Sequence, residues 1–138
     1  MKILVDANVP GAGACFAPLG ELRTMPGRAI DAAALQNVDA LVIRSITRLD
    51  AAMLDAAKAL GSPLKFVGTC TIGTDHVDQL ALARHDIAFA SAPGCNAEAV
   101  VDYVLASLLT LAERQGWYLA GRRVGIVGVG NVGGRLYQ

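Results

Sequence analysis

The chain has 138 residues, of which 54% are hydrophobic, and its 12 Lys and Arg residues balance 12 Asp and Glu residues. This composition can bury the core of one ordinary domain, which excludes a disordered chain. The neutral balance lacks the basic field through which proteins bind nucleic acid. The longest apolar stretch, Ala97–Ala112, is shorter than the ~20 residues of a membrane span and contains Glu98 and Asp102. We therefore expect a globular protein that binds neither nucleic acid nor a membrane.

The cysteines and the first residues indicate a cytoplasmic protein. Cys15, Cys70 and Cys95 are odd in number and form no C-x-x-C pair, so we interpret them as reduced thiols. No signal peptide is predicted at the N-terminus, because the short apolar run Ile3–Val5 meets Asp6 at once.

Five short aliphatic and β-branched runs predict five strands. In chain order they are Lys2–Val5, Glu21–Thr24, Asp39–Ile43, Leu64–Val67 and Ile87–Ala90. Helical patterns separate these strands, and they cover Ala12–Leu19, Asp31–Gln36, Asp50–Leu60 and Asp75–Arg84. Where such a range begins with an aspartate, that residue is the expected N-cap. The alternation indicates βαβ units and a parallel sheet. Because the strands are continuous apolar runs, we expect burial on both faces of the sheet.

A long helix is predicted over Asn96–Gln115, with Asn96 as its cap and Gly116 at its end. Apolar residues lie on most of its circumference, which is typical of a helix buried against two surfaces. We interpret it as a crossing between two domains. A connection over 117–122 and a strand over Arg123–Val127 are expected to follow. The predicted organisation is a substrate-binding domain over 1–95, an interdomain helix over 96–116, and the start of a dinucleotide-binding domain over 117–138.

The loops after four predicted strands carry the candidate ligand-binding residues. In a parallel α/β sheet, ligands bind at the carboxyl ends of the strands, which share one edge. These ends are Asp6–Pro10, Arg44–Thr47, Gly68–Gly73 and Ser91–Asn96. They contain a guanidinium, hydroxyl groups and glycines that leave backbone N–H groups open, which suits a carboxylate or a phosphate. Arg44 and Ser45 are the leading candidates, although Arg44 could pair with a surface carboxylate and Ser45 could cap a local turn.

The histidines and cysteines give no catalytic prediction. His76 is expected just inside a helix, where a lone histidine is more often structural, and His85 precedes a strand and is expected to be solvated. Cys70 and Cys95 lie in strand-end loops, but the sequence places no histidine base beside them, so we interpret them as packing residues. No catalytic residue and no metal ligand is therefore predicted in this chain.

A complete G-x-G-x-x-G motif lies near the end of the chain, formed by Gly128, Gly130 and Gly133. It follows a predicted strand and opens a predicted helix, which is the context of a dinucleotide-binding loop. In such loops the first glycine allows the turn, the second lets the backbone approach a pyrophosphate, and the third lets the helix pack on the strand. The acidic residue that would bind the adenosine ribose is expected ~20 residues later, beyond Gln138.

Together, five segments resemble the D-isomer-specific 2-hydroxyacid dehydrogenases. They are Lys2–Asp6, Val42–Ser45, Phe66–Asp78, Ser91–Asn96 and Val124–Gly133. The resemblance implies an α/β protein with a flavodoxin-like parallel-sheet substrate domain, followed by the first βα unit of a Rossmann NAD-binding domain. It also implies a homodimer in which NAD oxidises a small phosphorylated hydroxy acid, 4-phospho-D-erythronate, to the 2-oxo acid in pyridoxal 5'-phosphate biosynthesis.

By position, the resemblance makes Ser45 and Thr71 substrate contacts, and Asn131 and Val132 contacts to NAD. Arg44 is added on physical grounds alone. The family's catalytic arginine, glutamate and histidine are expected after Gln138, so the chain by itself is expected to be inactive. Two alternatives stay open. One is a non-catalytic module that binds an anion or self-associates through the long helix, and the other is a different family member, such as a phosphoglycerate dehydrogenase.

Overall fold

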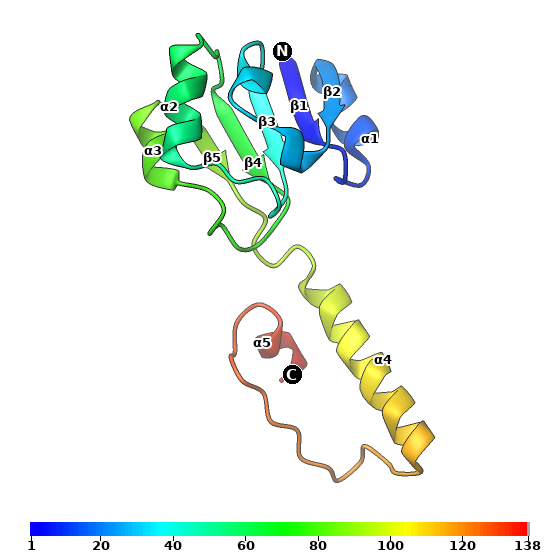
Figure 1. Cartoon of the computed structure of the whole chain (residues 1–138). Coiled ribbons are helices and arrows are strands. Elements are labelled where there is room, and N and C mark those ends of the chain that lie inside the picture. The colour runs from blue at the N-terminus through cyan, green and yellow to red at the C-terminus, as the bar shows by residue number, and fades with distance from the viewer. Residues whose placement is uncertain (138) are drawn as a thin grey trace. The chain divides into compact units, whose positions relative to one another are not determined.

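The first unit of the chain is a five-stranded parallel sheet (Figure 1). The structure is a computed structural model that describes residues 1–137, and contacts divide the chain into the unit Met1–Ala92 and a second unit that begins at Pro93. The strands are β1 (Lys2–Asp6), β2 (Glu21–Met25), β3 (Ala40–Ile43), β4 (Phe66–Thr69) and β5 (Ala88–Ala90). All five predicted strands are confirmed, with β4 beginning two residues later than expected.

The strand order is β2-β1-β3-β4-β5, which is the order of a flavodoxin-like sheet. Val5 pairs with Val42, Val42 pairs with Gly68, and Gly68 pairs with Ala90. All pairs are parallel, so the carboxyl ends of the strands lie along one edge. The shared edge predicted for the strand-end loops of this unit is therefore confirmed.

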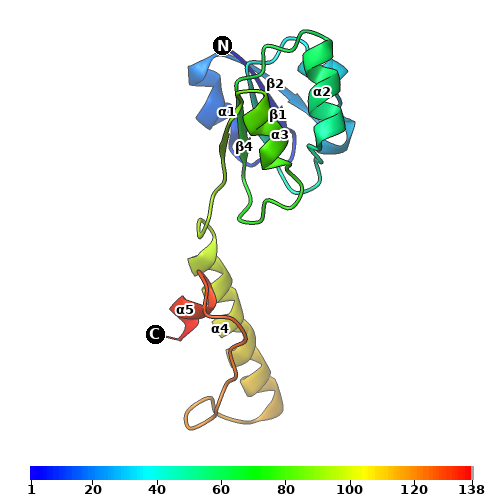
Figure 2. The same ribbon diagram turned by 90° about the vertical axis from the view of Figure 1, so that its left-hand side faces the viewer.

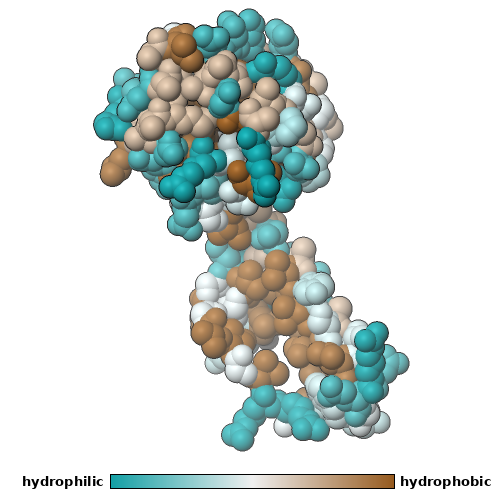
Figure 3. Space-filling view, in the orientation of Figure 1, coloured by the Kyte–Doolittle hydropathy of each residue, from teal (hydrophilic) through white to brown (hydrophobic). Residues whose placement is uncertain are grey.

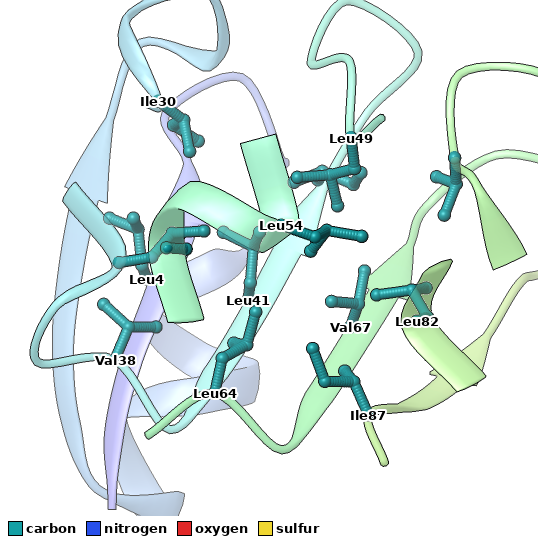
Figure 4. Close-up of a cluster of buried hydrophobic side chains, with 14 of the residues drawn as sticks. Leu4, Ile30, Val38, Leu41, Leu49, Leu54, Leu64, Val67, Leu82 and Ile87 are labelled. Carbon is teal, nitrogen blue, oxygen red and sulfur yellow. The ribbon is translucent and has the colours of Figure 1, made fainter. Parts of the chain in front are cut away.

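Helices of unequal size cover the two faces of the sheet. The helices α2 (Ala51–Ala59) and α3 (Gln79–Arg84) lie on one face, and α1 (Ala12–Phe16) lies on the other (Figures 1 and 2). The larger core joins alternate residues of the strands to α2 and α3 (Figure 4); its members include Leu4, Leu41, Leu54, Val67 and Leu82. Each of these side chains is at most 1% exposed, so the face under α2 and α3 is well sealed.

The opposite face of the sheet is covered only in part. Its smaller core consists of residues from β1, β3, α1 and the loop after β1: Ile3, Val5, Val9, Ala12, Ala40 and Val42. Phe66 of β4 is 38% exposed, and Ala88 and Ala90 of β5 are exposed as well. Burial on both faces is thus found for β1 and β3 and is wrong for the edge strands β2 and β5, neither of which has a buried residue. The five-residue helix α1 covers only part of the sheet.

The helix caps agree with the sequence in one case and differ in another. Asp50 caps α2 as predicted, since its carboxylate accepts a hydrogen bond from the Met53 N–H at 3.0 Å. Asp75 was the expected cap of the next helix, and this is wrong. The helix α3 begins at Gln79, and the carboxylate of Asp78 accepts from the Ala81 N–H at 2.9 Å.

Three short 3₁₀ helices complete the first unit. They are η1 (Ala17–Leu19), η2 (Gly27–Ala29) and η3 (Ala33–Leu35). The carboxylate of Asp31 accepts a hydrogen bond from the Ala34 N–H at 2.8 Å, so the predicted start of a brief helix at Asp31 becomes the entry to η3.

The second unit contains the long helix α4 (Ala97–Gln115), which ends at Gly116 in a left-handed conformation with φ of 68°. Asn96 stands at the N-cap position, but its side chain makes no capping hydrogen bond, contrary to expectation. Only Ala97 and Ala112 of α4 are buried, and Tyr103 is 72% and Leu109 58% exposed. The expected burial of α4 against two surfaces is therefore not found. Figure 3 shows the hydrophobic residues exposed on the second unit in brown.

The strand expected over Arg123–Val127 is absent from the described part of the second unit. A strand is defined by its partner, and within residues 93–137 no other extended segment pairs with this run. The predicted turn into a helix is present, since α5 (Gly133–Leu136) begins at the last glycine of the motif. No helix within residues 1–137 combines the length and the apolar character needed to span a membrane.

Candidate functional site

The candidate substrate site lies at the carboxyl edge of the first unit, where the strand order reverses. The chain goes from β1 outward to β2, and then from β3 outward in the other direction to β4. In sheets of this kind the crevice between those two starting strands is the usual ligand site. Asp6 is the last residue of β1, and Arg44 directly follows β3, so these two residues flank the crevice.

Arg44 reaches across the crevice to the loop after β1. Its Nη1 donates a hydrogen bond to the carbonyl oxygen of Asn8 at 3.2 Å, and its side chain is exposed. A guanidinium has five N–H donors, so this contact orients the group and leaves other donors facing outward. No ion pair between Arg44 and a carboxylate is found among residues 1–137, so the simple surface pairing considered for this arginine is not seen in the first unit.

Ser45 lies in the tight turn that follows β3. The Thr47 N–H donates to the carbonyl of Arg44 at 3.1 Å, and this turn leaves Ser45 exposed. The hydroxyl of Thr47 has a different role, because it is buried and donates to the carbonyl of Gly27 at 3.1 Å. Of the two hydroxyls considered after β3, Thr47 ties the turn to a neighbouring loop, and Ser45 is open to a ligand.

A buried carboxylate supports this edge, and sequence reasoning missed it. The Asp6 side chain is fully buried, and its Oδ1 accepts from the backbone N–H of Asn8 at 2.9 Å and from Asn8 Nδ2 at 3.2 Å. Within the described chain, Asp6 Oδ2 has no hydrogen-bond partner. Asp6 thereby holds Asn8, whose carbonyl receives Arg44. The only signal in the sequence was an acidic residue directly after a buried strand.

Thr71 belongs to a chain of hydrogen bonds after β4. Its Oγ1 lies 2.7 Å from Thr69 Oγ1 and donates to the carbonyl of Gly73 at 2.9 Å. Thr69 Oγ1 in turn lies 3.0 Å from His76 Nε2. Thr69 is buried and Thr71 is half-buried, so Thr71 is the member of the threonine pair that a ligand can reach. The involvement of His76 was not predicted.

His76 is held in a partly buried position, and this changes its acidity. Burial lowers the pKa of the imidazole below its usual value of 6.5, while the negative charge of Asp75 opposes this effect to a smaller extent. The backbone fixes the residue, because the Leu49 N–H donates to the His76 carbonyl at 2.8 Å. The expectation of a structural histidine is consistent with these contacts, and the helix expected around it is replaced by a turn.

Arg44, Ser45 and Thr71 lie on neighbouring strand ends. Ile43, the last residue of β3, pairs with Thr69, the last residue of β4, and the Cys70 N–H donates to the Ile43 carbonyl at 2.9 Å. The edge thus carries one guanidinium and two accessible hydroxyls, a donor set suited to the oxygens of a carboxylate or phosphate. Among residues 1–137 no cluster of three or more His, Cys, Asp or Glu side chains could hold a metal ion.

The glycine motif in the second unit has the backbone features that a dinucleotide loop requires. Gly128 has φ of +92°, in the region that favours glycine. A Cβ on Gly133 would collide with the Gly128 carbonyl oxygen and come within 3.1 Å of Ile126, so this position also requires glycine. A Cβ on Gly130 would meet nothing within 4 Å, so the backbone there is open to approach.

Asn131, a predicted cofactor contact, packs beside a glycine from the start of the same unit. Its Cγ lies 3.3 Å from the position that a Cβ on Gly94 would occupy, and Gly94 has φ of +76°. The Asn131 carbonyl accepts from Arg135 Nη1 at 2.6 Å. Val132, the other predicted contact, directly precedes α5. These residues and the three glycines have the arrangement of a loop that cradles a pyrophosphate in dinucleotide-binding folds.

Solved structures share the fold of this chain. NAD⁺-bound 3-phosphoglycerate dehydrogenase from Entamoeba histolytica matches 99% of this chain and 49% of its own chain, with a TM-score of 0.72 and 22% identity. D-Lactate dehydrogenase from Aquifex aeolicus, solved with NAD and lactic acid, matches 99% of this chain and 46% of its own chain, with a TM-score of 0.68 and 17% identity. At these identities the likeness shows the fold alone.

Curated relatives are much more similar in sequence. The erythronate-4-phosphate dehydrogenase of Chromohalobacter salexigens is 61% identical over all 138 residues, and that of Azotobacter vinelandii is 58% identical over the same length. In both cases the match covers 35% of the relative, so the chain spans about a third of the length of the curated relatives it matches.

The family itself is identified by the residues that carry the sheet. Residues 21–124 match the family described as D-isomer specific 2-hydroxyacid dehydrogenase, catalytic domain. The matched range includes β2 to β5, α4 and the residues at the carboxyl edge from Arg44 to Thr71. The chain therefore belongs to the D-isomer specific 2-hydroxyacid dehydrogenase family.

Proposed function

We propose that the whole protein to which this chain belongs oxidises 4-phospho-D-erythronate to its 2-oxo acid, with NAD as the hydride acceptor. The observation that carries the proposal is the 61% identity, over all 138 residues, to a protein named erythronate-4-phosphate dehydrogenase. The exposed donors at the carboxyl edge support it, because a phosphorylated hydroxy acid carries two anionic groups.

In this proposal the carboxyl edge of the first unit binds an anionic group of the substrate. Arg44 donates charge-assisted hydrogen bonds, and the hydroxyls of Ser45 and Thr71 donate to further oxygens of the same group. Asn8 keeps the guanidinium over the crevice, and Asp6 keeps Asn8 in place. These residues bind and orient the substrate and transfer no proton.

The second unit contributes the start of the cofactor site. NAD supplies the chemistry of the reaction by accepting the hydride. The backbone of Gly128, Gly130 and Gly133 would approach its pyrophosphate, with Asn131 and Val132 beside it. We further propose the domain division 1–95, 96–116 and 117–138, in which the last segment opens a Rossmann domain.

The test compares two phosphorylated acids with the intact gene product. We expect NADH to form with a higher kcat/KM on 4-phosphoerythronate than on 3-phosphoglycerate. The reverse preference would contradict the proposed substrate, and turnover of neither acid would contradict the proposed reaction.

The role of Arg44 is tested in the same assay. Hydrogen bonds to charged groups contribute about 1.5–3 kcal/mol, so Arg44→Gln is expected to lower kcat/KM by roughly 10- to 100-fold. Arg48→Gln is the matched control, because Arg48 is an exposed arginine near the same strand end that faces Asp50 at 3.7 Å. Equal effects of the two substitutions would remove Arg44 from the substrate site.

The 138-residue chain by itself is expected to show no turnover. It spans about a third of the length of its curated relatives, and the family resemblance places the catalytic arginine, glutamate and histidine after Gln138. Formation of NADH by the purified chain with 4-phosphoerythronate would contradict this expectation.

We also propose that the protein is a homodimer. The exposed apolar side chains of the second unit support this, since monomeric proteins rarely expose contiguous apolar patches larger than a few hundred Å². They include Tyr103, Leu105, Leu109, Leu111, Val124, Val127 and Val129. The same observation favours the self-associating module as a second candidate function.

A further inference from the structure

We propose that His76 is a positioning residue for substrate binding, which acts through Thr69 to fix the direction in which the Thr71 hydroxyl donates. In this role His76 touches no ligand. It keeps the hydroxyl hydrogen of Thr71 available to an anionic oxygen bound at the carboxyl edge. The inference rests on the proposed function, because it takes Thr71 as a contact to the anionic substrate.

The direction of the hydrogen bonds follows from the acceptor at the end of the chain. A carbonyl oxygen can only accept, so Thr71 must donate its single hydrogen to Gly73. Toward Thr69, at 2.7 Å, Thr71 must then accept, and Thr69 must donate. Since Thr69 has thereby used its own hydrogen, its remaining contact at 3.0 Å must be a hydrogen bond donated by His76 Nε2.

Hydrogen bonds donated in the opposite direction along this chain would prevent Thr71 from binding an anion. If His76 Nε2 carried no hydrogen, Thr69 would donate to the ring, and Thr71 would donate to Thr69. Thr71 would then turn only lone pairs toward a ligand, and an anionic oxygen would be repelled. With hydrogen on Nε2, an anionic oxygen can replace the Gly73 carbonyl as the acceptor of the Thr71 hydrogen. The tautomer of His76 therefore decides whether Thr71 can bind the anion.

The surroundings hold this arrangement in place. A short bridge pairs Val77 with Leu49, and both residues are buried. The Asp78 N–H donates to the Leu49 carbonyl at 2.8 Å, next to the bond between Leu49 and the His76 carbonyl. Burial also lowers the pKa of His76, which favours a neutral ring and makes its tautomer the deciding property.

A purely structural role, in which His76 only satisfies the buried Thr69 hydroxyl, makes different predictions. It requires some hydrogen bond between the two side chains, but either direction would serve. The positioning role requires hydrogen on Nε2 and an effect on substrate affinity.

The first test reads the tautomer by ¹⁵N NMR of the histidine rings in the 138-residue chain. We expect Nε2 of His76 to be protonated and Nδ1 to be unprotonated at pH 7.5. Thr69→Val removes the acceptor and is expected to shift the His76 ring signals toward a mixture of tautomers. His85, whose Nε2 lies 2.6 Å from Asp55, provides an internal reference that stays unchanged. An unprotonated Nε2 on His76 in the wild-type chain would overturn the proposal.

The second test measures substrate affinity in the intact gene product. Thr69→Val is expected to raise the KM for 4-phosphoerythronate about two- to tenfold, the effect of one neutral hydrogen bond, with kcat unchanged. Thr69→Ser keeps the hydroxyl and is expected to restore the wild-type KM. Equal KM values for the two variants, with folding verified by thermal unfolding, would overturn the proposal. A wild-type protein with the expected tautomer but no activity on 4-phosphoerythronate would instead refute the proposed function, because the tautomer is read without substrate.

Discussion

Gly27 shows how closely the side chains beneath the candidate site are packed. A Cβ at this position would collide with Asp6 Oδ2 and lie 2.7 Å from Thr47 Oγ1. Both side chains are buried; Asp6 is held by its hydrogen bond from Asn8, and Thr47 donates to the carbonyl of Gly27 itself, so neither can move away freely. The φ of Gly27 lies outside the left-handed region, so its backbone conformation does not require glycine. The neighbouring side chains of Asp6 and Thr47 do.

Gly27→Ala is expected to lower the free energy of unfolding by about 1–3 kcal/mol, which is the usual cost of overpacking a buried position. Gly13→Ala is the matched control, because Gly13 lies in α1 and a Cβ there would meet nothing within 4 Å. That control is expected to be neutral or to stabilise the chain by up to about 1 kcal/mol. Urea unfolding of the three chains measures the difference, and equal stabilities of wild type and Gly27→Ala would show that the side chains of Asp6 and Thr47 move aside at little cost.

His76 predicts a specific dependence of stability on pH. Burial lowers the pKa of His76 in the folded chain, whereas in the unfolded chain the pKa of this side chain is about 6.5. As the pH falls below that value, the unfolded state binds more protons than the folded state, so the fold loses stability. Wild type is therefore expected to lose stability relative to His76→Gln between pH 7 and pH 5.5, and to show a constant difference above pH 7.5. Urea unfolding across this range, with His85 common to both chains, checks the sign; a constant difference throughout would contradict the lowered pKa.

At the scale of the elements, two aspartates precede α3, and only one of them, Asp78, caps the helix. Asp78 accepts the hydrogen bond from Ala81, while Asp75 lies inside a turn in which the Val77 N–H donates to the Thr74 carbonyl at 2.9 Å. Asp78→Ala is expected to destabilise the fold by about 1 kcal/mol, the typical loss of a cap. Asp75→Ala, measured above pH 7.5 where His76 is neutral, is the control and is expected to change stability by less than about 0.5 kcal/mol. Thermal unfolding of both variants decides, and a larger loss at Asp75 would restore the original prediction.

The strands and their shared edge could be predicted because their signals are local. Every strand of the first unit except β2, which contains Glu21 and Arg23, has a short apolar run at its centre, and a parallel sheet places its carboxyl ends together whatever the details of packing. Ser45 and Thr71 each follow such a strand, so the sequence is enough to predict that both lie on one edge. The cap of α3 was missed because Asp75 and Asp78 both precede the same apolar pattern. The bridge between Leu49 and Val77 decides between them, and it joins residues far apart in the sequence.

Three other features could not be predicted from local sequence, because each depends on residues in another segment of the chain. The run Arg123–Val127 has the composition of a strand, but a strand also needs a neighbour, and composition does not supply one. The contact between Thr69 and His76 depends on the turn that replaces the expected start of a helix. The sequence predicts Asp6 as the first residue of the loop after the first strand, but its complete burial depends on Gly27 and Thr47, which lie on other segments.

At the scale of the whole molecule, the two units differ in how they bury apolar surface. The first unit seals one face of its sheet with α2 and α3. In the second unit, α4 buries only Ala97 and Ala112 among its described residues. Val127, in the run expected to form a strand, is fully exposed. Apolar surface of this kind is costly in water, so the second unit is the part of the chain from which association is expected.

The 138-residue chain is therefore expected to self-associate through its second unit, with a sedimentation coefficient that rises with concentration. Leu109→Glu places a charge on the exposed face of α4 and is expected to shift the chain toward monomer. Leu80→Glu is the matched control, since Leu80 is 81% exposed on α3 of the first unit and is expected to have no effect. Hydrogen exchange of the backbone amides of residues 123–127 supplies an independent measure. Unpaired amides exchange rapidly, whereas strand pairing with a second copy would slow their exchange in proportion to association. A chain that stays monomeric at all concentrations while these amides are protected would contradict self-association and would require a pairing partner within the chain.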